Sequence, residues 1–350
     1  MPFDRMLRGR FARFLGEMSR RSIHRKWAHG SVPLWDISQD CELTPSKTGV
    51  RFQHHSALNA VQLATSEVFE RLRARNWAAY LVGGTLRDLL LQSTRTESCL
   101  ATPRDIDVII IGASNHELTS CFSELIARRT RFGGLHLVKK IAQVCEVHFD
   151  VWALADTWAF KERGIKPKIS HFASTPFLNL DSVAIELYPN AGRPRAIYEE
   201  GFYRGIASRL IDINFERNPY PDVCIIRALI MAAKLQFALS RRLAEFISSW
   251  MARQPDALAA LRQAQVSHYG QVRCSTTELC SWLTFIHQQL TAGSERIELR
   301  VSDTRQLGLW SDYPPLQTAS QSDHLCGTSD LLSPTAFWHR SQVDGTSEAH

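Results

Sequence analysis

The spacing of apolar residues along the chain predicts an alternation of helices and buried strands. Residues 56–75 carry apolar side chains at helical spacing and predict an amphipathic helix. The apolar run at 78–82 ends in two glycines, which predicts a short buried strand and a turn. Residues 86–91 resume a helix. The run at 105–111 is rich in isoleucine and valine and predicts a second strand.

One more helix and two more strands complete this first part of the chain. Ser114 and Glu117 have the spacing of a capping box, and the apolar positions after them predict a helix that extends to Ile126. Residues 134–139 and 143–152 predict two further strands. We therefore expect an α/β domain with a mixed sheet and the element order α-β-α-β-α-β-β.

The second part of the chain is predicted to be mainly helical. Residues 176–188 and 195–198 predict a hairpin closed by a Pro-Asn-Ala-Gly turn. Two prolines precede a long helical stretch at 222–250, and helix is predicted again within 255–295. Residues 301–350 are rich in Ser, Thr and Asp without periodicity, which predicts a flexible tail.

These patterns divide the chain into four expected parts: an extension over 1–55, a sheet-containing head over 56–200, a helical neck and body over 201–300, and the tail. Residues 1–30 carry eight basic and two acidic side chains, a surplus that equals the net charge of +6 of the whole chain. The remaining residues are therefore neutral on balance. The arm fits an RNA contact, a transit-like segment or a solvated extension, and we favour the last.

Composition excludes several classes of protein. With 44% hydrophobic and 22% charged residues, the chain can bury a sizeable core and is not a disordered protein. No stretch reaches the roughly 18 uncharged apolar residues of a membrane span, so we expect no membrane partner. The eight cysteines show neither CxxC nor zinc-like spacing. With no secretory signal in view, we expect reduced thiols and a cytoplasmic location.

The first candidate for chemistry is the turn that contains Gly83, Gly84, Arg87 and Asp88. Glycines let a ligand approach the backbone, and the N-terminus of the following helix presents N–H groups to an anion. Arg87 adds a planar fork suited to phosphate. Taken alone, this pattern also fits a tight strand–helix turn with an Arg–Asp pair at the surface.

The second candidate is the pair Asp105 and Asp107, which point to one face at the start of a predicted strand. Two like charges there favour a compensating cation, and hard divalent metals take carboxylate ligands. A pair of solvated acids at a strand start is the alternative.

Together the two patterns resemble the class II tRNA nucleotidyltransferases and bacterial poly(A) polymerases. The head domain of that family carries GGxxRDxLL followed by a DxD. The resemblance implies a nucleotidyltransferase-fold head in which the glycine turn, Arg87 and Asp88 bind a nucleoside triphosphate. It also implies that Asp105 and Asp107 hold Mg²⁺.

A third carboxylate is expected on the strand at 143–152, since nucleotidyltransferases of this fold often place one there. Glu146 and Asp150 share a face with His148. Glu146 falls where the class II pattern has its acid, but Asp150 is followed by Val-Trp, which suggests burial. We favour Asp150 as the catalytic residue, and a plain exposed strand face is the alternative.

Two further segments follow the family pattern in part. Asn179 and the hydrophobic positions around it survive in the segment expected to contact the ribose, and the Arg-Arg-Asp before it is absent. In the neck, Arg227 matches one family arginine, while Cys224 and Ile230 replace two others. Because that Asp/Arg set selects the nucleobase in class II enzymes, CCA-type base selection is in doubt here. We assign Asn179 and Arg227 to nucleotide binding.

The resemblance implies metal-dependent transfer of a nucleoside monophosphate from a nucleoside triphosphate to an acceptor hydroxyl, with release of pyrophosphate. The acceptor it implies is an RNA 3′ end, as in poly(A) polymerases and CCA-adding enzymes. Two alternatives remain: the same chemistry on a protein or small-molecule acceptor, and a non-catalytic descendant that binds nucleotide or RNA. The intact acid pair argues against the last of these.

Overall fold

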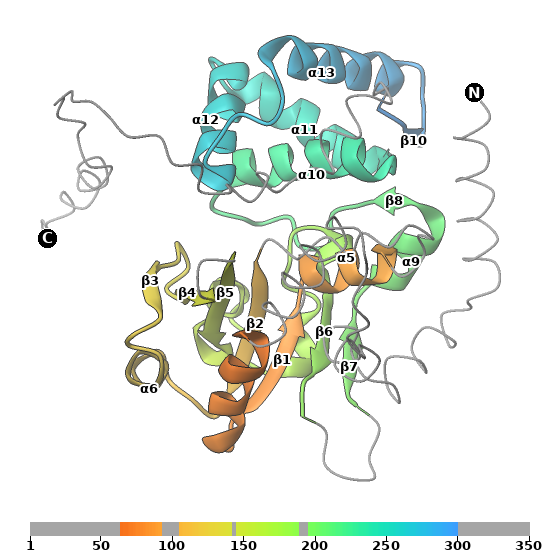
Figure 1. Cartoon of the computed structure of the whole chain (residues 1–350). Coiled ribbons are helices and arrows are strands. Elements are labelled where there is room, and N and C mark those ends of the chain that lie inside the picture. The colour runs from red at the N-terminus through yellow and green to blue at the C-terminus, as the bar shows by residue number, and fades with distance from the viewer. Residues whose placement is uncertain (1–63, 93–104, 142–144, 189–194, 300–350) are drawn as a thin grey trace, which may run out of the picture. The chain divides into compact units, whose positions relative to one another are not determined.

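The computed structural model describes residues 64–92, 105–141, 145–188 and 195–299, which lie within one compact unit of the chain (Figure 1). The basic extension over 1–55 and the tail expected from the sequence lie outside these residues.

A seven-stranded mixed sheet forms the first half of the described chain, in the order β3-β4-β5-β2-β1-β6-β7. The strands are β1 (Ala78–Val82), β2 (Ile106–Ile111), β3 (Ile126–Arg129), β4 (Leu135–Ile141), β5 (Cys145–Ala153), β6 (Val183–Glu186) and β7 (Ile197–Glu199). Among these strands β2 and β5 pair in parallel, and the other neighbours are antiparallel. The parallel register places Asp107 of β2 beside Asp150 of β5.

Several helices flank this sheet. The first occupies residues 64–74. The others are α5 (Gly84–Gln92), α6 (Asn115–Cys121), η1 (Leu154–Asp156), α7 (Trp158–Arg163), α8 (Ile169–Phe172), η2 (Asn179–Asp181) and α9 (Phe202–Ser208). The connection from β1 to α5 is direct: Gly83 has a φ of +67°, and the helix starts at the next residue.

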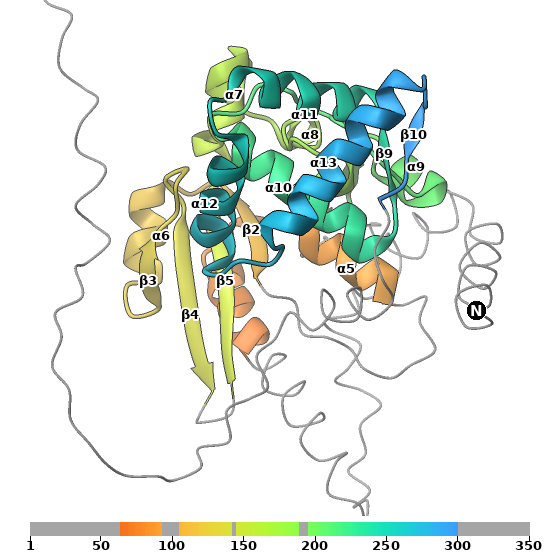
Figure 2. The same cartoon turned by 90° about the horizontal axis from the view of Figure 1, so that it is seen from above.

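Four longer helices follow, and Figure 2 shows them grouped side by side. They are α10 (Pro221–Leu235), α11 (Arg241–Arg253), α12 (Ala257–Tyr269) and α13 (Thr276–Thr291). A small sheet in the order β10-β9-β8 joins this part, with β8 (Leu210–Ile211), β9 (Ala238–Ser240) and β10 (Arg296–Ile297).

One cluster of buried apolar side chains runs from the sheet into the helices. It includes Leu81 of β1, Val108 of β2, Leu229 of α10 and Leu283 of α13. Because the two halves share a core, burial fixes the helices against the sheet domain. The expected fold class, a mixed α/β sheet followed by a helical part, is confirmed. Within the described residues, no helix has both the length and the apolar character that a membrane crossing requires.

The capping box at Ser114 and Glu117 is confirmed, but the helix it starts is shorter than predicted. α6 ends at Cys121, and Ile126 begins β3 instead of ending the helix. Phe122 and Leu125 are buried in the turn between the two elements. Apolar residues three positions apart are typical of a helix, but here a turn places both of them in the core.

The long helix expected at 222–250 is two helices with β9 between them. Gln236 adopts a left-handed φ of +53° and ends α10, and the side chain of Ser240 caps α11. The helical region within 255–295 is broken in the same way, because Gly270 at φ +73° ends α12. A capping box at Ser275 then starts α13.

The antiparallel strand pairing of the hairpin is confirmed with a later start, and its predicted Pro-Asn-Ala-Gly turn lies outside the described residues. β6 pairs with β7 in antiparallel register, with Val183 opposite Glu199. The strand expected from residue 176 begins only at Val183, because the residues before it form the 3-10 turn η2.

Candidate functional site

A cleft of about 140 Å³ gathers most of the side chains singled out by the sequence. It is bounded by α5, the start of β2, α10 and the end of α12. Its lining residues are Gly84, Thr85, Arg87, Asp88, Asp105, Asp107, Arg227, Ile230, Met231, Lys234, Leu235, His268, Tyr269 and Arg273. Six of them belong to the residues predicted to bind nucleotide or metal.

The two glycines leave space for charged side chains. A Cβ on Gly83 would lie 3.3 Å from Oδ2 of Asp107, and a Cβ on Gly84 would lie 3.1 Å from Nη2 of Arg87. Thr85 donates a hydrogen bond from Oγ1 to the carbonyl of Asp105 at 2.7 Å. The turn is therefore built against both the arginine of α5 and the acids of β2.

Asp105 and Asp107 stand at the start of β2, where both are partly exposed to the cleft. Because β2 lies between β1 and β5, Asp107 has the glycine turn on one side and Asp150 on the other. Two carboxylates of one strand thus line the same cavity. Among the described residues, no group of three or more His, Cys, Asp or Glu side chains forms a ready metal cage.

Asp150 contacts His136, and His136 in turn contacts His148. Nδ1 of His136 lies 2.7 Å from Oδ1 of Asp150, and Nε2 of His136 lies 3.2 Å from Nδ1 of His148. Burial lowers the pKa of His148, and the opposing effect of Asp105 does not cancel it. The imidazole of His148 therefore favours its neutral form.

Glu146, the other candidate for the third carboxylate, lies elsewhere on β5. It is exposed and forms an ion pair of 3.1 Å with Lys140 of β4. The register places Asp150, and not Glu146, beside Asp107. A catalytic role for Asp150 stays a prediction.

Arg87 takes part in an ion-pair network instead of pointing freely at solvent. Its Nε contacts Asp88 at 2.8 Å, and its Nη1 contacts Asp181 at 2.7 Å. Burial lowers the pKa of Arg87, but the carboxylates of Asp88 and Asp181 outweigh it and raise the pKa above its ordinary value. Arg87 is therefore a permanent cation at the wall of the cleft.

Sequence reasoning missed Asp181, which joins the two arginines predicted to bind nucleotide. Its second oxygen contacts Nη2 of Arg227 at 2.7 Å, and its side chain is only 9% exposed. An acid within the apolar stretch 177–187 was the available signal. Buried carboxylates are rare unless a cation pairs with them.

Asn179 lies outside the cleft. Its Nδ2 donates to the carbonyl of Leu210, and its Oδ1 accepts from the N–H of Asp212. This buried amide ties η2 to the residues that lead toward α10. A contact between Asn179 and a nucleotide stays a prediction.

The end of α12 was also missed as part of the site. It contributes His268 and Tyr269, and the following loop contributes Arg273. The buried side chain of Gln265 fixes this loop, because its Oε1 accepts from the N–H groups of Arg273 and Cys274 at 2.8 and 2.7 Å. No motif in the sequence signals this contribution.

Charge is divided between the two walls of the cleft. The sheet domain supplies Asp105, Asp107 and the ion pair of Arg87 with Asp88, and the helical part supplies the cations Arg227, Lys234 and Arg273. Such a division suits a ligand that brings a hard cation to the acids and several anionic oxygens to the basic side chains.

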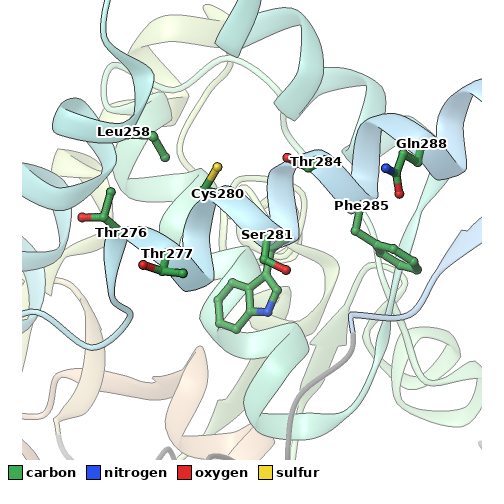
Figure 3. A pocket seen from close by; sticks show the side chains of 9 residues that line it. Leu258, Thr276, Thr277, Cys280, Ser281, Thr284, Phe285 and Gln288 are labelled. Atoms are coloured by element: carbon green, nitrogen blue, oxygen red, sulfur yellow. The ribbon is translucent and has the colours of Figure 1, made fainter.

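A larger cavity of about 740 Å³ lies along α13 (Figure 3) and shares no lining residue with this cleft. The side chains along it are mostly small, polar or aromatic, with Thr276, Cys280, Ser281 and Phe285 among them. It contains no carboxylate or cation, so it offers no equivalent of the acid pair.

Comparison with known proteins gives only distant similarity. No protein-family model matches the sequence, and no curated protein matches it. A solved tRNA-processing enzyme with CTP is similar at 20% identity and a TM-score of 0.41, over 63% of this chain and 56% of that chain.

Two other solved structures are similar at the same level. A tRNA nucleotidyltransferase complexed with a primer tRNA and an incoming ATP analog shows 18% identity and a TM-score of 0.41, over 66% of this chain and 61% of that chain. The Thermotoga maritima CCA-adding enzyme complexed with tRNA shows 15% identity and a TM-score of 0.35, over 74% and 66%. The chain spans less than two thirds of the first two, so the case for a function rests on the cleft.

Proposed function

We propose that this chain is a nucleotidyltransferase that uses Mg²⁺ and transfers a nucleoside monophosphate to an acceptor hydroxyl at an RNA 3′ end. One observation carries the proposal: the pair Asp105 and Asp107 faces Arg227 and Lys234 across a cleft closed by a glycine turn. Two carboxylates opposite several cations suit a metal-bound triphosphate.

The acid pair fits the metal. Mg²⁺ is usually held by one or two carboxylates and completes its shell with water and substrate phosphates, so Asp105 and Asp107 suffice as protein ligands. When bound, Mg²⁺ lowers the pKa of the acceptor hydroxyl and neutralises charge on the phosphates. Gly83 keeps the space beside Asp107 clear for that shell.

The basic side chains hold the triphosphate in this proposal. Arg87 and Arg227 come from different elements, and Asp181 fixes both guanidinium groups. Lys234, further along α10, extends the positive wall. The N-terminus of α5 adds N–H groups that favour an anion.

The transfer step forms one bond and breaks one. The acceptor oxygen bonds to the α-phosphorus, and the bond from that phosphorus to the bridging oxygen of the β-phosphate breaks. Pyrophosphate leaves with the electron pair. Asp150, held by His136 and adjacent to Asp107, accepts the hydroxyl proton.

The test is a labelling experiment. Purified full-length protein is incubated with Mg²⁺, total RNA and each nucleoside triphosphate labelled at the α-phosphate, and the products are separated on a denaturing gel. Label on RNA, with released pyrophosphate, is the expected result, and the extended sequence distinguishes poly(A)-like from CCA-like products. Label on protein or on a small molecule would replace the RNA acceptor, and no transfer to any acceptor would refute the proposed function.

A pair of matched variants tests whether the transfer takes place in the cleft. Asp107→Asn removes a charge at the glycine turn without changing the size of the side chain. Glu146→Gln makes the same change on an exposed acid of β5 outside the cleft. Transfer should be lost in the first variant and retained in the second.

A further inference from the structure

Four aromatic side chains form a continuous series of contacts on the described surface. Centroid distances are 5.7 Å between Tyr220 and Phe132, 5.6 Å between Phe132 and Trp158, and 5.9 Å between Trp158 and Phe215. The middle pair is stacked, with 17° between the ring planes. The rings come from the β3–β4 turn, the start of α7 and the segment before α10.

A cation lies over each end of this series. The guanidinium carbon of Arg131 is 5.5 Å from the ring centroid of Tyr220, and that of Arg163 is 5.4 Å from Phe215. We call these six residues, Arg131, Tyr220, Phe132, Trp158, Phe215 and Arg163, the ring row. Exposed Arg128 and Arg129 of β3 add further positive charge near its first end.

Packing alone does not explain the ring row. Phe132 is 42% exposed, and the other three rings are each partly exposed. A set of rings that served only to join loops would be covered by its neighbours, as Phe149 and Phe160 are in the core. Exposed aromatic area flanked by arginines instead resembles a surface that receives a flat, anionic partner.

The ring row adjoins the cleft. Arg131 donates from Nη2 to the carbonyl of Ser267 at 2.8 Å, and the next two residues, His268 and Tyr269, line the cleft. At the same end of the row, Tyr220 immediately precedes α10, which carries Arg227. A flexible chain that lies on the rings can therefore place its end in the cleft.

We propose that the ring row binds the unpaired bases of a single-stranded RNA whose 3′ end enters the cleft. Bases stack on aromatic rings without regard to sequence. Arg131 and Arg163, at the two ends of the row, contact phosphates of the same strand. The positive charge of the arginines excludes a cationic or purely apolar partner. The inference rests on the proposed function in naming the RNA as the acceptor.

The experiment measures binding of a fluorescein-labelled oligoadenylate of about ten nucleotides, a length within the usual span of such surfaces, by fluorescence anisotropy. No nucleoside triphosphate is present. Phe132→Ala should weaken affinity about tenfold or more, as the loss of one base–ring stack does. Phe132→Trp should retain affinity, because the larger ring also stacks.

Charge is tested separately through salt. Arg131→Gln or Arg163→Gln should reduce the slope of log affinity against log salt concentration by about 0.7, the value for one phosphate contact on a single strand. Arg253→Gln is the matched control, because Arg253 is an exposed arginine at the end of α11. Its slope should equal that of the unmodified protein.

Phe285→Ala is the control for the aromatic change. Phe285 is partly exposed on α13 beside the larger cavity, and it lies outside the ring row (Figure 3). It should bind the oligonucleotide as the unmodified protein does. A duplex RNA of equal length should bind equally to the unmodified protein and to Phe132→Ala, since paired bases are not free to stack.

The outcomes separate the two proposals. Unchanged affinity in Phe132→Ala, an equal loss in Phe285→Ala, or no binding by the unmodified protein would overturn the ring row. If Phe132→Ala weakens binding while the labelling experiment shows no transfer, the RNA surface stands and the proposed function falls. If RNA is extended while Phe132→Ala binds normally, the proposed function stands and the ring row is not the RNA surface.

Discussion

Asp181 and Arg227 form an ion pair of 2.7 Å that links the 3-10 turn η2 of the sheet domain to α10. The other oxygen of the same carboxylate contacts Arg87 of α5, also at 2.7 Å. One buried acid thus sets the position of two arginines on different walls of the cleft. Both the stability of the protein and the geometry of the proposed triphosphate site therefore depend on this residue.

Asp181→Ala should therefore destabilise the protein strongly. The change leaves Arg87, whose side chain is only 12% exposed, without one of its carboxylates. Removal of one partner of a buried pair costs about 3–5 kcal/mol, because the remaining charge is left uncompensated. Urea unfolding followed by circular dichroism measures the loss. Asp88→Ala, at a carboxylate 25% exposed, should cost less; an equal loss in both variants would contradict the central place of Asp181.

Asp105→Asn and Asp107→Asn should abolish transfer and leave the fold intact. Both acids lie at the start of a strand and line the cleft, so they are not part of the apolar core. We expect rates to fall by about a thousandfold or more, since the loss of a metal ligand removes several kcal/mol of transition-state stabilisation. Transfer is measured by the labelling assay, and folding by thermal melting without metal. Melting temperatures should be unchanged or raised, because mutual repulsion is relieved.

Gly83→Ala should impair the cleft beyond its effect on the backbone. Gly83 has a φ of +67°, where a side chain costs roughly 1–2 kcal/mol, and the new methyl group would lie against Asp107. The expected result is weaker binding of a magnesium–triphosphate complex in calorimetry, together with a lower melting temperature.

Gly164→Ala measures the cost of a side chain at a positive φ alone, without the contact to Asp107 that Gly83→Ala adds. Gly164 has a φ of +62°, and a Cβ there meets nothing within 4 Å. Its melting temperature should fall by a similar amount while triphosphate binding stays normal. Equal binding in the two variants would show that the space beside Asp107 does not matter.

Cys224 should resist alkylation in the folded protein. Burial raises the pKa of its thiol to about 12, so the reactive thiolate is scarce at neutral pH. Cys280 is exposed and should react before Cys224 with iodoacetamide at pH 8. Mass spectrometry after timed quenching measures both sites. Because the folded pKa lies above the unfolded value, Cys224 also contributes stability below about pH 8.5 that is lost progressively up to about pH 12; a Cys224→Ala variant should lack this part of the alkaline loss.

The sequence predicted the parts of the fold in which local chemistry agrees with the tertiary structure. The glycines after β1 and the capping box at Ser114 are local signals, and the structure has both. The break after α10 had no such signal. Gln236 adopts a left-handed conformation that few side chains favour, so the pairing of β9 with β8 and β10 decides it.

The residues of the candidate site also differ in whether a local sequence pattern reveals them. Asp105 and Asp107 could be found because two acids beside an apolar strand are conspicuous in sequence. Arg273 could not be assigned, since it lines the cleft only through packing between distant segments. The position of Asp181 in an apolar stretch signals a buried acid, but not its pairing with Arg87 and Arg227. The register of β2 and β5, which sequence spacing does not fix, places Asp150 and not Glu146 beside Asp107.

The side chain of Gln265 has a consequence for how this protein can change over evolutionary time. The acids at the start of β2 belong to a strand that pairs with a neighbour on each side. The loop with Arg273 is held in part by one buried amide. Mutation can reshape that loop, and with it the choice of ligand, while the acid pair stays in place. The cleft thus combines an acid pair built into the sheet with a loop that can vary independently of it.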